Sequence, residues 1–193
     1  MNIKRYLQAD YLPIPLIATM ILTRFHHFGD VLHLPDASLA VFFFAGFYRK
    51  KMLLGFLLAL AALIDYLAIS NGTSDWCVTP AYAFLIPTYA VMWFAGRYCS
   101  NLGARQTTEL AFSTGAMGLL ALATSIAFII SNGSFYLFSD RYTEMSWLQY
   151  ADRVAHYYPL YMGSTLIYGI FGYALVKLIK AIAATQDGHK TVS

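Results

Sequence analysis

Long apolar segments separated by short polar ones dominate this chain, and six of them are candidates for membrane-spanning helices. A helix needs about 20 predominantly apolar residues to cross the hydrocarbon core of a bilayer. The runs here are continuous and lack the two-residue alternation of a half-buried strand. The pattern therefore predicts an all-α protein with a six-helix transmembrane bundle, whose spans cover residues 12–28, 37–48, 52–69, 80–95, 110–130 and 157–179.

The second of these spans is short, because Asp36 and Arg49 bound the apolar stretch ASLAVFFFAGFY. We expect a tilted or half-submerged helix there. Pro87 lies inside the fourth span, where a missing N–H and a ring clash kink a helix. Before the sixth span, residues 146–157 have amphipathic helical spacing, which predicts a lid-like helix on the membrane surface.

Composition agrees with the membrane prediction. Of 193 residues, 59% are hydrophobic and 12% charged, whereas globular domains average roughly 45–50% and about 25%. No small-residue cleavage site follows the first apolar segment, so we expect a retained helix rather than a signal peptide. We expect one transmembrane domain over residues 1–193, ending in a polar, frayed tail at 185–193.

The basic residues predict the orientation, because cytoplasmic loops are enriched in Lys and Arg. Ten of the thirteen fall on one side of a six-span arrangement, namely Lys4, Arg5, Arg49, Lys50, Lys51, Arg97, Arg105, Lys177, Lys180 and Lys190. Both termini are then cytoplasmic, and the segments 26–36, 70–79 and 131–156 face outward. The net charge of +3 is therefore a topology signal and not a nucleic-acid surface.

The two cysteines bracket the fourth span and are predicted to lie roughly 30 Å apart at 1.5 Å per residue. A disulfide requires Cα atoms about 5.5 Å apart, so they do not pair with each other. Cys99 falls in the segment GRYCSNLGAR, which is predicted to be a cytoplasmic loop, and it is expected to be inert. Cys77 falls on the oxidising side, where an unpaired thiol suggests an intermolecular bond or a reactive role. The alternative is a small apolar filler beneath the loop.

Other ionisable side chains are predicted at the same outward depth. Asp65 lies near the end of the third span, where a carboxylate usually faces a cavity or a partner. A paired, structural carboxylate is the alternative. The ends of four spans bring together Asp65, Cys77, Tyr82, His26 or His27, and Arg153. Such a group around a membrane-level cavity is typical of a binding site.

Three segments, HHFGD, LIDY and above all WCVTPAY, together with six spans in this length, resemble the BtuM family. This family comprises predicted cobalamin (vitamin B12) transporters of bacterial inner membranes and is similar to the S-components of energy-coupling-factor transporters. The resemblance implies cobalamin uptake by a multi-pass inner-membrane protein surrounded by lipid, with a periplasmic cobalamin donor as a further partner. It also implies that Cys77 ligates the corrinoid cobalt. Asp65, Tyr82, a histidine (His26 in preference to His27) and Arg153 match pocket residues.

The chemistry of cobalamin is compatible with that assignment. The corrin ring fills the equatorial positions of cobalt, so a protein reaches only an axial site, which a single soft thiolate suits. A thiolate at one axial position weakens the opposite ligand, so cyanide would leave cyanocobalamin on binding, with Cys77 in a catalytic role. Flat aromatic walls would hold the ring, and candidates are Trp76, Tyr82, Phe84, Phe135, Tyr136 and Trp147.

The resemblance has one departure. Docking S-components often carry an Ala-xxx-Ala strip on the first span, whereas here Leu22 follows Ala18 after four residues. The sequence thus favours a solitary transporter without an energy-coupling module. The rival hypotheses are a carrier for another vitamin, in which Cys77 is dispensable, and a membrane-embedded thiol oxidoreductase, which would need a second outward cysteine. A purely structural subunit is a third.

Overall fold

A computed structural model of the chain describes residues 13–24, 34–48, 51–76, 78–103 and 108–190. Within these ranges the regular secondary structure is helical, with no strand. The helices are α2 (Pro13–Arg24), α4 (Ser38–Phe47), α5 (Lys51–Ser70), the 3₁₀ helix η1 (Pro80–Phe84), α6 (Leu85–Gly103), α7 (Glu109–Phe138), α8 (Trp147–Ala155) and α9 (Tyr158–Lys190).

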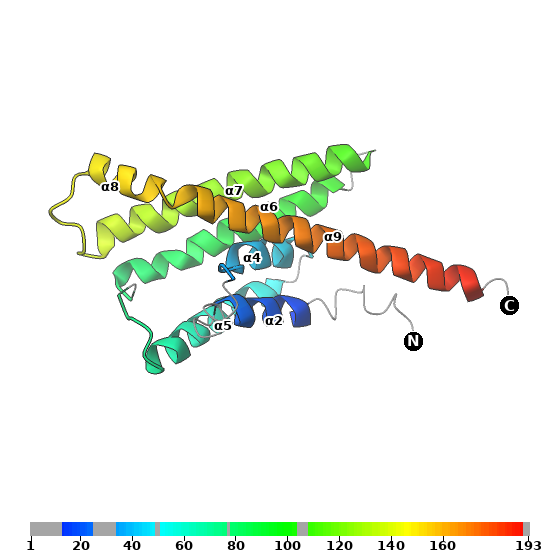
Figure 1. The fold of residues 1–193 in the computed structure, drawn as a ribbon, viewed down its shortest axis with the longest axis horizontal. Helices are drawn as coiled ribbons and strands as arrows, with labels where there is room; N and C mark the ends of the chain where they lie inside the picture. Colours follow the sequence, from blue (N-terminus) through cyan, green and yellow to red (C-terminus); the bar gives the residue numbers. More distant parts are fainter. Residues whose placement is uncertain (1–12, 25–33, 49–50, 77, 104–107, 191–193) are drawn as a thin grey trace.

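The long helices run along one axis, and α4 lies between them (Figure 1). α4 contacts α2, α5, α6 and α9, and α6 also packs against α7. The connections 71–79 and 139–146 lie at the same end of the bundle as α8, on the left of Figure 1. That shared end agrees with the prediction that both segments belong to one side. We refer to it as the outward end, a label taken from that prediction.

The short second helix is the centre of the structure. Eight of the ten residues of α4 are buried, and Phe42 at its middle is fully so. Other helices surround α4, so its short length does not place it at the edge of the bundle, and the tilted or half-submerged helix stays a prediction. Two glycines permit this position: a Cβ at Gly46 would overlap the backbone of Trp93, and one at Gly96 would overlap that of Phe43. The backbones of α4 and α6 therefore touch, as in small-residue helix crossings.

The predicted spans agree with the helices in position but not always in length. α4 and α5 match spans two and three within one residue at each end. The prediction missed polar extensions, because α6, α7 and α9 continue 8 to 11 residues beyond the expected ends. The ends of the first span, residue 12 and residues 25–28, lie outside the described residues. Pro87 falls in the first turn of α6, just after a change from 3₁₀ to α geometry, where its missing N–H costs little.

Two predictions about the last third of the chain had different outcomes. The helix predicted at 146–157 is present as α8, while its place on a membrane surface stays a prediction. α8 begins with a capping box: the Ser146 hydroxyl accepts from the Gln149 N–H, and the Gln149 side chain accepts from the Ser146 N–H. The tail expected to be frayed from residue 185 is helical as far as Lys190, where α9 ends. Residues 191–193 lie outside the described part.

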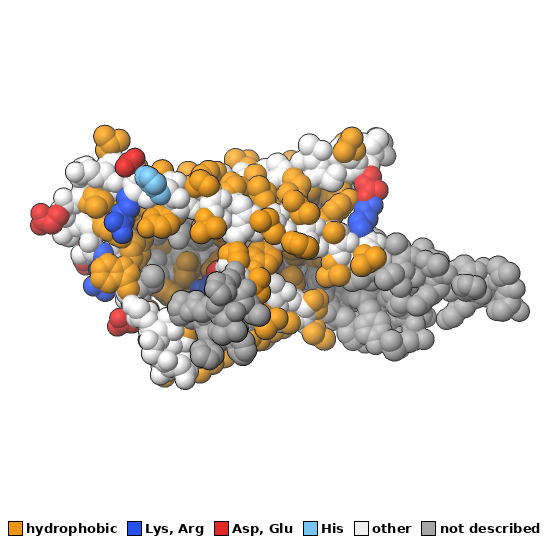
Figure 2. All heavy atoms as spheres, in the orientation of Figure 1, with side chains coloured by type: hydrophobic (Ala, Val, Ile, Leu, Met, Phe, Trp, Pro, Cys, Tyr) orange, Lys and Arg blue, Asp and Glu red, His pale blue; other side chains and the backbone are white. Residues whose placement is uncertain are grey.

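Among the described residues, two helical segments are long and apolar enough to cross a membrane, Met52–Ser70 and Glu109–Phe138. Helices α2 and α4 are apolar but shorter. Large apolar side chains are exposed along the bundle, among them Met52, Phe94, Ile129, Leu160 and Phe171. Figure 2 shows hydrophobic side chains over the middle of one face and charged ones toward its two ends. This distribution gives weak support to a membrane location.

Candidate functional site

One arginine gathers side chains from five segments near the outward end. The Arg24 guanidinium, at the end of α2, donates from Nε and Nη2 to the two carboxylate oxygens of Asp65 on α5, at 2.8 and 2.6 Å. Its Nη1 donates to the Tyr89 hydroxyl on α6 at 2.5 Å, to Ser38 Oγ at 3.1 Å and to Asp36 Oδ2 at 3.3 Å. The Tyr82 hydroxyl, on η1, donates to Asp65 Oδ2 at 2.6 Å. We call these six residues the Arg24 network.

The network forms because each member is positioned by its own helix. Asp36 Oδ1 accepts the N–H of Ser38 two residues on, an Asx turn that starts α4. The Tyr89 ring is stacked on Phe42 with centroids 4.3 Å apart, so its hydroxyl has little freedom. Bidentate pairing of arginine with a carboxylate adds directional strength. The guanidinium is 9% exposed, and the carboxylates of Asp65 and Asp36 are 23% and 47% exposed.

A cavity of about 410 Å³ adjoins the network. Arg24, Asp36 and Tyr89 form part of its wall, and the rest includes Ser131 from α7, Tyr157 just before α9, and Tyr161 and Ser164 on α9. We call it the polar cavity. The wall offers a cation, a carboxylate and several hydroxyls within an otherwise apolar lining, an arrangement typical of a ligand pocket.

The structure brings two of the predicted site residues together. Asp65 and Tyr82 are hydrogen-bonded to each other and connect to the polar cavity through Arg24, which lines it. Cys77 and His26, with its alternative His27, lie outside the described residues. Arg153 lies outside the network: it is exposed on α8, with its guanidinium 5.7 Å from the ring centre of Tyr142.

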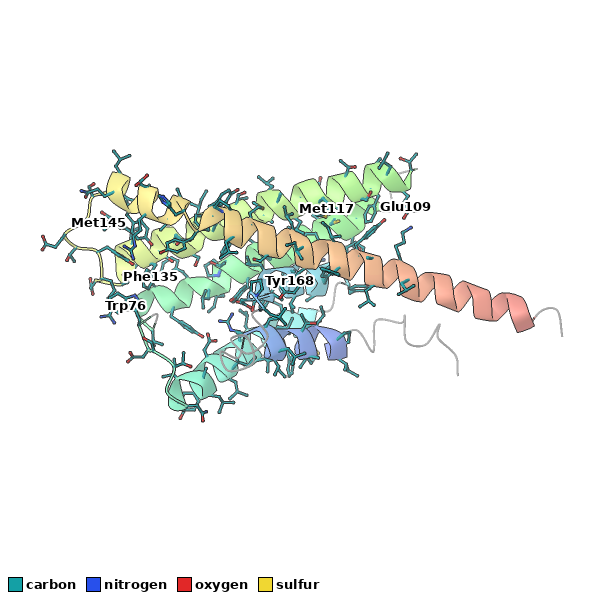
Figure 3. The ribbon with its side chains drawn as sticks, in the orientation of Figure 1. Trp76, Glu109, Met117, Phe135, Met145 and Tyr168 are labelled. Atoms are coloured by element: carbon teal, nitrogen blue, oxygen red, sulfur yellow. The ribbon has the colours of Figure 1, made fainter. Side chains whose placement is uncertain are left out.

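Aromatic side chains gather at the outward end beside α8. Tyr136 packs on Trp147 with ring centroids 4.1 Å apart and on Tyr150 at 4.8 Å. The Tyr150 hydroxyl donates to the backbone carbonyl of Asn132, fixing α8 against α7. Burial raises the pKa of Tyr150 to about 12, so this hydroxyl remains a donor at neutral pH. Figure 3 shows Trp76, Phe135 and Met145 at this same end.

The predicted aromatic wall takes a different form from the one expected. Phe84 stacks on Phe138 at 4.9 Å, and Phe135 lies edge-on to Tyr142 at 5.9 Å. None of the six predicted wall residues, all of them described, lines the polar cavity. Tyr136 and Trp147 pack on each other, whereas the rings of Phe84 and Phe135 pack on residues outside the predicted set.

The chain on either side of position 77 is described. Trp76 and Val78 are both exposed, and Arg141 stacks on the Trp76 ring at 4.2 Å. Thr79, at the N-cap of η1, has a buried hydroxyl without a hydrogen-bond partner among the described residues. Leaving such a group unpaired costs about 1–3 kcal/mol, so a bound water or ligand that satisfied it would be stabilised. Cys99 lies within α6, so the predicted loop is wrong there, and its thiol is free and buried, in agreement with its expected inertness.

Arg24, which ends the first apolar helix, was not assigned to the site by the sequence analysis. An arginine at the end of an apolar helix is expected to pair with a carboxylate at the same depth in the membrane. Asp65 was already predicted at that depth, so the pairing could have been inferred from the sequence. Tyr89 follows Tyr82 by seven residues, two helical turns, which would have placed it on the same face. Asp36 and Ser38 gave no such signal, because their role depends on how the chain enters α4.

No family model matches this chain, and no curated protein is significantly similar to it.

Proposed function

We propose that this chain is a multi-pass helical protein of the bacterial inner membrane that binds cobalamin at its outward end and carries it inward. The observation that supports the proposal best is the Asp65–Tyr82 hydrogen bond, held by Arg24 at the wall of the polar cavity. Two residues chosen as ligand-binding from separate segments thus belong to one network, on the side of the bundle that carries the 71–79 connection.

Membrane placement is supported by the two membrane-length apolar helices and by large exposed apolar side chains on α5, α6, α7 and α9. In water such a surface would drive aggregation, whereas in a bilayer it lies against lipid. The proposal assigns α2, α4, α5, α6 with η1, α7 and α9 to the six spans, with both termini cytoplasmic. α4 would then be a span shielded from lipid by its neighbours.

The residues would act in distinct ways. The Cys77 thiolate would donate an electron pair to cobalt at one axial position. Where cyanide occupies the opposite position, it would leave with its own electron pair, so the cobalt oxidation state is unchanged. The Arg24 network would hold the outward ends of α2, α5 and α6 in a fixed geometry. Hydroxyls of the polar cavity, such as Tyr161 and Ser164, would bond to the peripheral amides.

The size of the cavity limits how cobalamin would fit. Pockets for drug-sized ligands measure about 300–1,000 Å³, and a corrinoid is a larger molecule than such ligands. The polar cavity of about 410 Å³ would therefore hold only one edge of it. The remainder would lie toward the 71–79 connection, where an axial ligand at position 77 would reach cobalt.

The test is to purify the protein from cells supplied with cyanocobalamin and record its visible spectrum and cobalt content. We expect a red, stoichiometric cobalt complex, with an absorption shift relative to free cyanocobalamin. Cys77→Ala should lose the shift and most of the cobalt, whereas the matched control Cys99→Ala, at the buried thiol, should keep both. A colourless, cobalt-free wild type would contradict cobalamin binding. An unchanged shift in Cys77→Ala would contradict axial ligation alone.

The same preparations distinguish the rival functions. A carrier for another vitamin would contain no cobalt and would be unaffected by Cys77→Ala. A thiol oxidoreductase would have to use Cys99 as its second thiol, yet that residue is buried on α6 and lines a separate, apolar cavity. This observation favours the transporter over the oxidoreductase.

A further inference from the structure

A second and larger cavity lies toward the other end of the bundle. Its volume is about 540 Å³, and α4, α6, α7 and α9 enclose it. Most of its wall is apolar, including Phe44, Phe47, Phe112, Met117 and Leu120. We call it the apolar cavity. Figure 3 shows Met117 and Glu109 toward this end, far from Trp76 and Phe135.

The polar groups of this cavity are concentrated at its rim. Lys177 on α9 forms an ion pair with Glu109, the first residue of α7, and the Tyr173 hydroxyl donates to Glu109 Oε1 at 2.9 Å. The Lys177 ammonium also lies 5.9 Å from the centre of the Tyr173 ring. The side chains of Lys177 and Glu109 are 46% and 60% exposed, so both charges remain accessible from outside.

The position of the rim relates the cavity to the bilayer. Glu109 is the first residue of the membrane-length segment Glu109–Phe138, so this pair lies where the apolar surface of α7 begins. The wall residues Phe112, Ala116 and Leu120 follow on α7 at the spacing of one helical face and lead from the rim into the apolar depth. A ligand with a charged head and an apolar tail would thus find both environments in the right order.

The charges at the rim indicate which headgroup a bound lipid would carry. Lys177 would pair with a phosphate, and Glu109 would accept hydrogen bonds from a primary ammonium group. A zwitterionic ethanolamine phospholipid carries both groups in one head, two methylene groups apart, with an acyl chain to fill the apolar cavity. A choline head lacks N–H donors, and a glycerol head lacks the cation.

We propose that the apolar cavity binds one acyl chain of an ethanolamine phospholipid, whose head lies on the Lys177–Glu109 pair. This inference rests on the membrane location in the proposed function but not on cobalamin. The lipid would support α9 where it passes α4. At that point a Cβ at Gly172 would overlap the Phe44 ring, so the two helices meet closely beside the cavity.

The test uses the full chain, purified in mild detergent from cells grown without cobalamin. Phosphatidylethanolamine, phosphatidylcholine and phosphatidylglycerol with identical acyl chains are added, and bound lipid is counted by native mass spectrometry. Ala116→Phe fills the cavity, and we expect it to weaken phosphatidylethanolamine binding at least about tenfold. Ala111→Phe is the matched control on the same helix, at an exposed position outside the cavity, and should bind like the wild type.

Two further variants test the head and do not depend on cavity filling. Lys177→Met should weaken all three lipids by about threefold to tenfold, whereas Glu109→Gln should remove the preference for ethanolamine over glycerol heads. Equal binding of choline and ethanolamine lipids to the wild type would overturn the assignment of the head. Unchanged binding in Ala116→Phe, or an isoprenoid quinone displaced by that variant, would overturn the assignment of the cavity.

Membrane extraction separates this inference from the proposed function. A protein that stays in carbonate-washed membranes but retains no ethanolamine lipid overturns the lipid site and leaves cobalamin uptake standing. A protein that washes off overturns the membrane location, and the lipid site with it. Circular dichroism of Ala116→Phe and Ala111→Phe checks that both remain helical.

Discussion

The two cavities are built on opposite principles. At the polar cavity, one guanidinium donates hydrogen bonds to acceptors on α4, α5 and α6 and in the segment before α4, and each bond has a required direction. At the apolar cavity, α4, α6, α7 and α9 meet through rings and methylene groups, which have no such requirement. Its one ion pair lies at the exposed rim.

The difference shows which end of the bundle has one defined geometry and which end can accommodate ligands of variable shape. Directional bonds to a buried charge allow one arrangement, so the outward end is suited to recognising a ligand of fixed shape. Apolar contacts vary smoothly with distance, so the other end can accept a flexible chain. α4 joins the two, because Ser38 at its start belongs to the Arg24 network and Phe44 and Phe47 near its end line the apolar cavity.

The largest loss of stability should come from removing the Arg24 guanidinium. Arg24→Met leaves Asp65 and Asp36 as nearby carboxylates without their cation, and losing one partner of a buried ion pair typically costs about 3–5 kcal/mol. We expect the free energy of unfolding to fall by about 3 kcal/mol, the lower end of that range, because both carboxylates are partly exposed. Unfolding of the purified protein in detergent, followed by circular dichroism, measures it.

Arg97→Met is the matched control for Arg24→Met. Arg97 lies over the Trp93 ring with its guanidinium carbon 5.6 Å from the ring centre. Losing a contact of this kind costs roughly 0.5–1 kcal/mol. Equal losses in the two variants would mean that the Arg24 network does not specify the outward end.

The next largest effect should come from the crossing of α4 and α6 between the cavities. A Cβ at Gly46 would overlap the carbonyl of Trp93, so Gly46→Ala must push the two helices apart. Overpacking of this kind costs about 1–3 kcal/mol. Gly55→Ala on α5 is the control, because a Cβ there has no neighbour within 4 Å. It should stabilise the helix by about 0.5–1 kcal/mol, and thermal unfolding of both variants would reveal the opposite signs.

These two sites also show what the sequence could and could not predict. Hydrophobic runs predicted the helices, because apolar length alone decides whether a segment such as Lys51–Ser70 forms one. The burial of α4 could not be predicted, since Gly46 and Gly96 acquire meaning only when the two helices meet. Asp65 and Tyr82 were found from depth and resemblance. Ser38 was not, because its partner depends on the angle at which the chain enters α4.

A smaller loss of stability is expected when the Tyr82 hydroxyl is removed. Tyr82→Phe removes one hydrogen bond to the Asp65 carboxylate but leaves the Arg24–Asp65 pair intact. Bonds to charged groups contribute about 1.5–3 kcal/mol, so we expect a loss near about 1.5 kcal/mol at this partly exposed site. Tyr66→Phe, an exposed position on α5, should stay within about 0.5 kcal/mol. If Tyr82→Phe changed the free energy of unfolding and the cobalt content as little as Tyr66→Phe does, Tyr82 would have neither a structural nor a ligand-binding role.

The smallest predicted effect concerns the contact between the two outward connections. Trp76 and Arg141 come from segments on either side of α6 and α7, and their stacking at 4.2 Å links the 71–79 connection to the 139–146 connection. A partly exposed cation–π pair contributes about 0.5–1 kcal/mol. A double-mutant cycle with Trp76→Ala and Arg141→Met should give a coupling energy of that size in detergent unfolding.

A parallel cycle with Trp147→Ala and Arg141→Met provides the control, because Trp147 packs on Tyr136 instead. We expect its coupling energy to be near zero. If the Trp76 cycle also gave none, the two connections would be independent, and the Arg24 network alone would hold the outward end together. If it gave the expected value, the segment next to position 77 would be held by a contact that is weak enough for a ligand to displace. A ligand bound next to position 77 would then displace the Trp76–Arg141 contact and leave the Arg24–Asp65 ion pair intact. The ion pair is several times stronger than the cation–π contact.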